Sequence, residues 1–191
     1  MFLEQFPEEG KSHGWLEVVC GSMFSGKTEE LIRRLRRAEF ANQSFLLFKP
    51  KLDNRYSDDQ IISHAGDQFD AINIENPAQI LTYWTEQKVV AIDEVQFFDT
   101  TILGVVSELA SKGVRVICAG LDMDYKGKPF GPVPYLMAAA EYITKVHAIC
   151  VSCGNLAQFS HRTVKEDSQV LLGAVEKYKP LCRNCFNKIE H

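Results

Sequence analysis

The sequence predicts an α/β fold with a mostly parallel sheet flanked by helices, followed by a small C-terminal lobe. Short apolar segments alternate with amphipathic segments up to about residue 149, a glycine-rich turn follows the first of them, and two close cysteine pairs occur from residue 150 onward. Alternating strands and helices favour a parallel sheet, because each parallel crossover needs a connection long enough to hold a helix. We place the boundary near residue 147, between an α/β domain at residues 1–147 and a lobe at residues 148–191.

Length, composition and charge exclude several classes of protein. The 191 residues suffice for one α/β core and a small appendage, and 46% of them are hydrophobic. The net charge is -4 and the pI is near 5.8, whereas a protein that binds a nucleic-acid backbone usually has a strongly basic face. The first ten residues carry acids where a secretory signal has positive charge, and no apolar run approaches the roughly 18 residues of a membrane span. We therefore expect a cytoplasmic protein that binds neither nucleic acid nor membranes, with reduced thiols.

The first half of the chain alternates between strand and helix patterns. Residues 15–20 form an apolar strand, and residues 27–42 follow with helical periodicity, because Leu31, Leu35 and Ala38 recur on one face. Glu29 and Glu30 precede Arg33 and Arg34 by four residues, which predicts ion pairs on the exposed side of this helix. The next predicted elements are a strand at 44–48, a polar loop or hairpin at 51–66, a strand at 71–74 and a helix at 77–87.

The second half continues the same alternation. A buried strand at residues 89–92 is followed at once by two acids, and a helix at residues 102–110 stops at Gly113, a favourable residue after a helix end. A strand at 114–119, a long loop from 120 to 134 and a last strand at 142–149 complete the predicted core.

A phosphate-binding loop is predicted between the first strand and the first helix. The segment matches the pattern G-x-x-x-x-G-K-[S/T], and its flanking strand and helix are the context that this pattern requires. Its glycines let backbone N–H groups surround a phosphate near a helix N-terminus, Lys27 would reach the β- and γ-phosphates, and the Thr28 hydroxyl would hold Mg²⁺. An accidental glycine-rich turn is the alternative. The predicted ATP-binding residues are Gly21, Ser22, Met23, Phe24, Ser25, Gly26, Lys27, Thr28 and Asp93.

Two adjacent acids complete the predicted metal site. Asp93 directly follows a buried strand, where phosphate-loop proteins place the second acid that holds Mg²⁺. Glu94 would point away from Asp93 and could accept a proton from an attacking hydroxyl group. It could also cap a helix, lie in solvent, or activate water as in an ATPase. The pair therefore predicts the metal site, but it does not show whether a substrate hydroxyl or water accepts the phosphate.

Two C-x-x-C pairs predict a structural zinc site in the lobe. Cys150, Cys153, Cys182 and Cys185 provide four thiolates, the ligand set of tetrahedral Zn²⁺ with no open position. A lobe of this size cannot form a stable core unaided, so a metal would stabilise it. The alternatives are redox chemistry, or His147 or His161 as a replacement ligand. Cys20 and Cys118 lie in apolar strands and are predicted to be core residues.

Taken together, these motifs closely resemble the thymidine kinase family that includes the bacterial and animal cytosolic enzymes. They occur in family order over nearly the whole chain, from about residue 15 to residue 187. The matching segments are residues 21–28, residues 51–56 (KLDNRY), residues 92–98 (IDEVQFF), residues 119–125 (AGLDMDY), residues 130–134 (FGPVP), the two cysteine pairs and residues 176–183 (EKYKPLCR).

The resemblance implies that the γ-phosphate of ATP is transferred to the 5′-hydroxyl of thymidine, and also of deoxyuridine. It implies Glu94 as the general base, with Lys27 and Arg55 as further catalytic residues. It implies a loop between Cys153 and Cys182 that covers the nucleoside, a homotetramer, and feedback inhibition by dTTP. The substrate-binding residues that it implies are Met23, Asp53, Phe97, Leu121, Phe130, Ser160, Gly173 and Tyr178.

Two features depart from the family pattern, and two other functions remain open. Ala174 stands where a second glycine is often found, and residues 164–170 are unusually polar. A zinc-bearing phosphate-loop ATPase that acts on nucleic acid is the main alternative, but the low pI and the absence of a Lys/Arg cluster in the lobe disfavour it. An interaction module with a vestigial ATP site is disfavoured by the intact Lys27, Thr28, Asp93 and Glu94.

Overall fold

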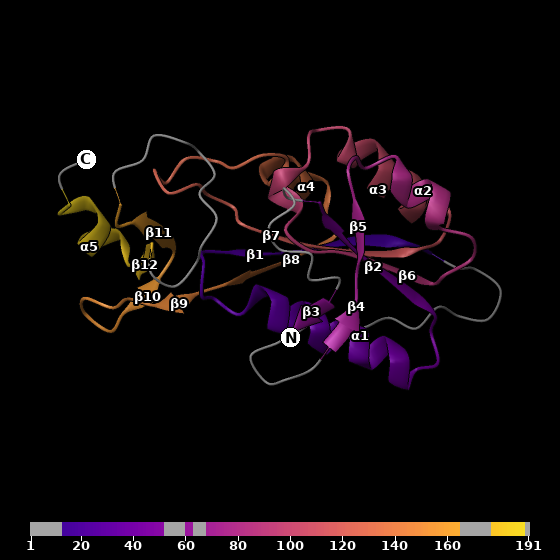
Figure 1. The fold of residues 1–191 in the computed structure, drawn as a ribbon, viewed down its shortest axis with the longest axis horizontal. Coiled ribbons are helices and arrows are strands. Elements are labelled where there is room, and N and C mark those ends of the chain that lie inside the picture. Colours follow the sequence, from indigo (N-terminus) through magenta and orange to yellow (C-terminus); the bar gives the residue numbers. More distant parts are fainter. Residues whose placement is uncertain (1–12, 52–59, 63–67, 165–176, 190–191) are drawn as a thin grey trace.

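A six-stranded parallel sheet forms the centre of the protein (Figure 1). The computed structural model describes residues 13–51, 60–62, 68–164 and 177–189. Every pair of neighbouring strands in this sheet is parallel, as the alternating sequence pattern predicts. The strands lie in the order β5 (Ile72–Ile74), β2 (Phe45–Pro50), β6 (Val89–Ile92), β7 (Arg115–Gly120), β1 (Trp15–Gly21) and β8 (Tyr142–Val146).

Helices cover both faces of this sheet (Figure 1). On one face, α1 (Lys27–Phe40) buries Leu31, Leu35 and Ala38 against the sheet, so the predicted apolar face of this helix is confirmed. On the other face lie α2 (Gln79–Tyr83), the short 3₁₀ helix η1 (Val95–Phe97), α3 (Ile102–Ser111) and α4 (Val133–Ala139). Because both faces are covered, β6 and β7 are buried along their whole length, and apart from Arg115 at the start of β7 their residues are apolar or glycine.

Three elements differ from the sequence predictions. Helix α2 is shorter than the predicted 77–87, because Trp84 has an extended backbone and its indole N–H donates to the carbonyl of Gln87. The sequence pattern did not predict α4, since its prolines indicate a loop, yet proline fits the first turn of a helix, where no N–H partner is needed. The predicted strand 142–149 is two strands, β8 in the main sheet and β9 (Ala148–Ile149) outside it.

The remaining elements form three small two-stranded sheets. Strands β3 (Gln60–Ile62) and β4 (Gln68–Asp70) are antiparallel; β3 lies within the predicted loop or hairpin at 51–66, and β4 lies just beyond its end. In the C-terminal lobe, β9 pairs with β10 (Leu156–Ala157), and β11 (Phe159–Arg162) pairs with β12 (Tyr178–Leu181) before helix α5 (Arg183–Asn187). The lobe has its own small apolar cluster, in which the rings of Phe159 and Phe186 stack with centroids 4.3 Å apart. No helix in the described part of the chain is long and apolar enough to cross a membrane.

A buried charge cluster joins α1 to strands β1, β7 and β8. Glu17 of β1 is fully buried, and its carboxylate accepts from Arg34 at 2.6 Å and from Arg115 at 2.7 Å. Arg34 also donates to Glu30 at 2.9 Å and to the Thr144 hydroxyl at 2.8 Å. The predicted pairing of Glu30 with Arg34 is confirmed, but its predicted place on the exposed side is wrong, because Arg34 is only 2% exposed. Because both guanidinium groups are buried, removing the Glu17 carboxylate would destabilise the fold.

Substitution of Glu17 tests the importance of this cluster. Glu17→Gln should lower the free energy of unfolding by about 3–5 kcal/mol, because buried Arg34 and Arg115 would lose the buried carboxylate that they share, and Arg34 would keep only its pair with Glu30 among the ion pairs described. Urea unfolding of the purified variants measures this change. Glu108→Gln is the matched control, since it removes the exposed ion pair with Lys112 and should cost less than about 1 kcal/mol. Equal effects of the two substitutions would contradict the prediction.

Candidate active site and metal centre

The loop between β1 and α1 has the backbone geometry of a phosphate cradle. Gly21 and Gly26 have positive φ angles of 150° and 84°, and a Cβ at Gly21 would lie 2.2 Å from the carbonyl oxygen of Val146. Phe24 also has a positive φ of 64°, which is rare for a residue with a side chain. Such turns direct successive N–H groups toward one point, at which the N-terminus of α1 adds partial positive charge.

Polar side chains of the loop are arranged around its own backbone. The Lys27 Nζ donates to the carbonyl of Ser22 at 3.0 Å, and the Ser25 hydroxyl donates to the same carbonyl at 2.7 Å. The Thr28 hydroxyl donates to Asp93 Oδ2 at 3.1 Å, across 65 positions of sequence. The structure therefore brings the predicted lysine, hydroxyl and strand-end carboxylate together.

Asp93 and Glu94 lie in a tight turn at the end of β6. Asp93 is 4% exposed, and its Oδ1 accepts from the N–H of Glu94 at 2.9 Å. Burial, and then the charge of Glu94, raise the pKa of Asp93 to about 7. A bound cation would offset both effects, because it favours the charged carboxylate. Glu94 has a positive φ of 52°, a strained conformation that is often found at functional sites.

Gln96 connects Glu94 to the end of β7, and the sequence patterns did not single it out. Its Nε2 donates to Glu94 Oε2 at 2.5 Å, and its Oε1 accepts from the N–H of Leu121 at 3.0 Å. The side chain is almost completely buried. Its place two residues after the acid pair, in the segment IDEVQFF, was the available signal in the sequence.

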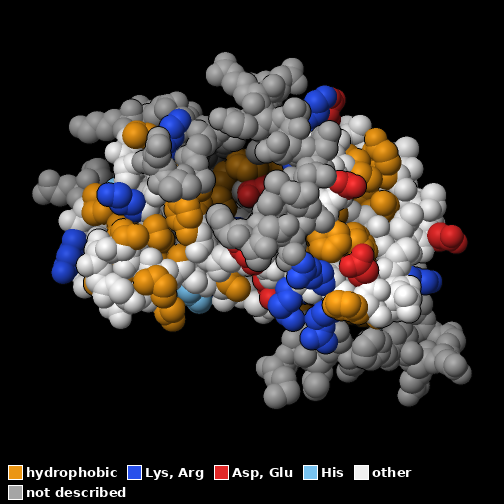
Figure 2. Space-filling view, turned by 60° about the horizontal axis from the view of Figure 1, so that its bottom comes forward, with side chains coloured by type: hydrophobic (Ala, Val, Ile, Leu, Met, Phe, Trp, Pro, Cys, Tyr) orange, Lys and Arg blue, Asp and Glu red, His pale blue; other side chains and the backbone are white. Residues whose placement is uncertain are grey.

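Several predicted substrate-binding residues lie on segments that meet near these acids. The rings of Phe97 and Phe130 pack edge to face with centroids 5.8 Å apart, and Leu121 lies at the end of β7, joined to η1 through Gln96. A hollow opens on the face of the molecule shown in Figure 2, and hydrophobic and acidic side chains gather at its visible wall. Apolar and aromatic walls with a few polar groups are typical of small-molecule sites.

The lobe contacts the phosphate loop directly. The Ser160 hydroxyl of β11 accepts from the N–H of Met23 at 2.9 Å, and the Ser22 hydroxyl donates to the carbonyl of Ala157 at 3.4 Å. Ser160 and Met23, predicted as separate substrate contacts, are therefore hydrogen-bonded to each other.

Tyr178 of β12 is held by an arginine that the sequence patterns did not single out. The Arg162 guanidinium donates to the Tyr178 hydroxyl at 2.8 Å, and it lies 3.7 Å from the ring centroid of Tyr125. Such a stacked guanidinium joins the base of the lobe to the loop after β7. The predicted site residues Asp53, Arg55 and Gly173 lie outside the described residues.

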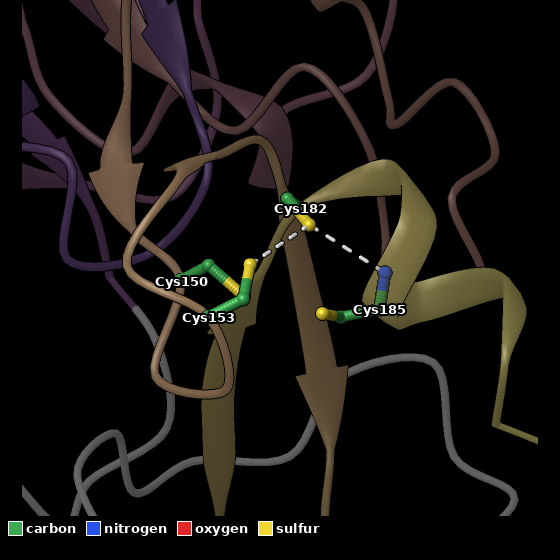
Figure 3. Close-up of side chains that lie close together, drawn as sticks. All are labelled: Cys150, Cys153, Cys182 and Cys185. Atoms are coloured by element: carbon green, nitrogen blue, oxygen red, sulfur yellow. Dashed lines mark hydrogen bonds between the residues drawn. The ribbon is translucent and has the colours of Figure 1, made fainter.

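Four cysteines from separate segments converge in the lobe (Figure 3). Their sulfur atoms all lie within 4.8 Å of one another, and the Sγ atoms of Cys153 and Cys182 are 3.6 Å apart. A tetrahedron with Zn–S bonds of about 2.3 Å has edges of about 3.8 Å, so this arrangement fits zinc. A disulfide needs about 2.05 Å, which the 3.6 Å separation exceeds. Neither His147 nor His161 belongs to this cluster within the described chain. The cluster consists of Cys150, Cys153, Cys182 and Cys185.

Hydrogen bonds to sulfur distinguish this cluster from the other two thiols. The backbone N–H of Asn155, and then its side-chain amide, lower the pKa of Cys153, while the N–H of Cys185 donates to Cys182 Sγ at 3.5 Å. Burial instead raises the pKa of Cys20 to about 11 and that of Cys118 to about 12. Zinc binds thiolates, but hydrogen bonds with Cys153 and Cys182 raise the pKa of Cys185 to about 12, so without a metal the four thiols do not all favour the ligand form. Cys20 and Cys118 are core residues as predicted.

Comparison with known proteins identifies the family. The family model described as thymidine kinase matches residues 14–186. The chain belongs to the thymidine kinase family. This assignment agrees with the phosphate loop, the acid pair and the four clustered cysteines of the structure, and it makes the protein an enzyme of the thymidine kinase type.

Curated thymidine kinases are similar to this chain over nearly its whole length. The thymidine kinase of Bacteroides fragilis (strain YCH46) is 55% identical over 188 residues, which cover 98% of this chain and 94% of the relative. That of Bacteroides thetaiotaomicron is 55% identical over 97% of this chain and 94% of the relative, and that of a Rhodothermus species is 52% identical over 93% and 83%. Among solved structures, the flagellar accessory protein FlaH from Methanocaldococcus jannaschii matches with a TM-score of 0.48 at 14% identity, over 90% of this chain and 88% of that chain.

The raised pKa of Asp93 predicts a pH-dependent cost of folding without Mg²⁺. The folded protein keeps a proton on Asp93 up to about pH 7, whereas the ordinary carboxyl pKa is 3.8, so stability falls as the pH rises between these values. Asp93→Asn stays neutral and keeps partners for Thr28 and the N–H of Glu94. In buffer without added Mg²⁺ it should therefore raise Tm by roughly 2–8 °C at about pH 8.5.

Thermal unfolding of the two proteins at two pH values measures this difference. The gain in Tm should shrink toward about pH 5, where wild-type Asp93 is itself protonated. A gain of the same size at both pH values would show that the ionisation of Asp93 is not its cause.

Proposed function

We propose that this enzyme transfers the γ-phosphoryl group of ATP to the 5′-hydroxyl of thymidine, and also of deoxyuridine, giving the nucleoside monophosphate and ADP. The observation that carries this proposal is the hydrogen bond between Thr28 and Asp93, which places the phosphate loop beside the acid pair. Phosphoryl transfer depends mostly on positioning and on stabilising negative charge, and this junction offers groups for both.

The phosphate loop would bind the triphosphate of ATP. The N–H groups of residues 21–26 would surround the phosphates, and the flexible Lys27 side chain would move from the Ser22 carbonyl to the phosphate oxygens. The Thr28 hydroxyl and the Asp93 carboxylate would hold Mg²⁺, since they lie within 3.1 Å of each other and form an oxygen donor set suited to this ion. When bound, Mg²⁺ supplies positive charge that offsets the charge of the phosphates.

Glu94 would act as the general base for the acceptor hydroxyl. It is half-buried, adjacent to Asp93, and held by Gln96. A carboxylate in hydrogen-bond reach of the 5′-hydroxyl can take its proton as the new oxygen–phosphorus bond forms.

The thymine ring would lie between apolar side chains of the two parts of the molecule. The edge-to-face pair of Phe97 and Phe130 supports this placement, because flat bases gain contact area from aromatic walls. Ser160 already accepts from the Met23 N–H, so its contact with the nucleoside would use the hydroxyl proton. Met23, Leu121 and Tyr178 would complete the wall. Three further residues would contribute from outside the described residues: Arg55 as a catalytic residue near the transferred phosphoryl group, Asp53 beside it, and Gly173 near the sugar.

The lobe would hold one structural Zn²⁺ and cover the nucleoside. All four positions of a tetrahedral site are filled by sulfur, so no open position remains for catalysis. We extend the proposal to a boundary near residue 147 between the α/β domain and the lobe. Cytoplasmic location, a homotetramer and inhibition by dTTP also belong to the proposal and are based on family membership.

The proposed reaction is tested by measuring ATP consumption with thymidine, with single-stranded DNA, and with neither. Consumption that depends on thymidine supports the kinase, whereas stimulation by DNA would support the ATPase alternative. A panel of thymidine, deoxyuridine and deoxycytidine then defines the acceptor.

Glu94→Gln tests the proposed base. The amide cannot accept a proton, so turnover should fall by about 10²–10⁴-fold while ATP and thymidine still bind. Steady-state kinetics and calorimetry of both ligands measure these effects. Turnover close to wild type would remove Glu94 from the proton transfer.

Cys182→Ser tests the zinc lobe. The variant should lose bound zinc by elemental analysis, and thymidine binding should weaken by about tenfold or more, because ordering the lobe would oppose binding. ATP binding should weaken less, since the described residues of the lobe reach the phosphate loop through two hydrogen bonds. Cys118→Ser is the control, because Cys118 is a core thiol outside the cluster. Unchanged thymidine affinity in a zinc-free variant would contradict the proposal.

A further inference from the structure

We propose that Gln96 is a positioning residue, which orients the Glu94 carboxylate so that Oε1 is the oxygen that takes the proton. This inference rests on the proposed kinase function. Gln96 contacts the side chain of Glu94 and the backbone of Leu121, two residues that the proposed function places on different substrate groups.

The two hydrogen bonds of Gln96 fix the direction of its amide. The NH₂ group faces a carboxylate, which only accepts, and the carbonyl oxygen faces a backbone N–H, which only donates. Rotating the amide by 180° would place oxygen against carboxylate and NH₂ against N–H, so both bonds would be lost. The two partners therefore select one orientation.

Close packing against two glycines holds Gln96 in place. A Cβ at Gly120 would lie 2.7 Å from the Gln96 Oε1, and a Cβ at Gly131 would lie 2.2 Å from the Gln96 carbonyl oxygen. Any larger residue at either position would displace Gln96. With 2% exposure, its side chain cannot exchange its partners for water without local opening.

This arrangement leaves one oxygen of Glu94 for chemistry. Oε2 already accepts from Gln96, whereas no hydrogen bond or ion pair from the described residues reaches Oε1. In the proposed step the 5′-hydroxyl oxygen forms a bond to the γ-phosphorus, the bond from that phosphorus to the leaving oxygen of ADP breaks, and the hydroxyl proton moves to Glu94 Oε1. The Gln96 N–H cannot accept this proton, so it stays hydrogen-bonded to Oε2 throughout.

The other end of Gln96 sets the position of Leu121 relative to this base. Because one amide holds both the Leu121 N–H and the Glu94 carboxylate, the distance between the proposed nucleoside wall and the base is fixed. A displacement of about 1 Å between reacting groups can lower turnover by about 100-fold. Gln96 therefore affects kcat more than it affects nucleoside binding.

Gln96→Glu separates the two ends of the side chain. The new side chain has nearly the same shape and keeps an acceptor for the Leu121 N–H, but it places a carboxylate against Glu94. We expect kcat for thymidine to fall by about 10–100-fold, with KM changed by less than about threefold. In a Glu94→Gln background the same substitution should lower the residual kcat by less than about threefold, because the amide then present at position 94 can donate to the new carboxylate.

Gln96→Met and Gln87→Met provide a second variant and a control. Methionine at position 96 removes both hydrogen bonds with little change in volume, so kcat should fall and thymidine KM should rise. Gln87 also uses both ends of its amide: its oxygen accepts from the N–H of Thr85, and its NH₂ donates to the Thr85 hydroxyl. It lies before the amino end of β6, whereas Glu94 follows the carboxyl end of that strand. Gln87→Met should keep wild-type kinetics. Thermal unfolding of each variant shows that it is folded.

The outcomes separate this inference from the proposed function. If Glu94→Gln abolishes turnover while Gln96→Glu and Gln96→Met keep wild-type kcat, the positioning role is overturned and the proposed base stands. If Gln96→Glu lowers kcat by the same factor in the wild-type and Glu94→Gln backgrounds, Gln96 does not act through Glu94, and the inference is also overturned. If Glu94→Gln itself has normal turnover, Glu94 is not the general base, and the positioning role of Gln96 is overturned with it.

Discussion

The hydrogen bond between Thr28 and Asp93 depends on the order of strands in the parallel sheet. Parallel strands bring their carboxyl ends to one edge, so the loop after β1 and the acids after β6 lie on the same side, with only β7 between the two strands. Leu121, directly after β7, contributes its N–H at that edge, and Gln96 joins it to Glu94. Residues from three distant segments thus form one site because the sheet holds their backbones rigidly.

Buried ion pairs hold the first helix on the sheet, and strained turns stand at the end of the sheet where the site lies. Glu17, Arg34 and Arg115 are buried and connect α1 to β1 and β7, with Arg115 at the amino end of β7. Phe24 and Glu94 have left-handed backbone angles, and each stands at the tip of a turn that follows a buried strand. Such conformations cost about 1–3 kcal/mol each and persist only in firm surroundings. The buried ion pairs and the parallel sheet provide those surroundings.

The lobe is joined to the site by hydrogen bonds as well as by the chain. Ser160 and Ala157 contact the phosphate loop, and Arg162 stacks on Tyr125 of the loop after β7. The same short strands carry or adjoin the cysteines, so the order of the proposed zinc site and the geometry of the phosphate loop are physically linked.

The sequence by itself determined the parallel α/β core, the phosphate loop, the acid pair and the cysteine set, because each has a local pattern or a fixed spacing. It did not determine α4, whose prolines fit a first turn only in context, or the burial of Arg34, whose partner Glu17 is distant in sequence. Only the tertiary structure decided that Ser160 bonds Met23 and that Gln96 bonds both Glu94 and Leu121. The reason is that a glutamine or a serine has no pattern of its own. Its role is set by the groups that the fold places within about 3 Å of it.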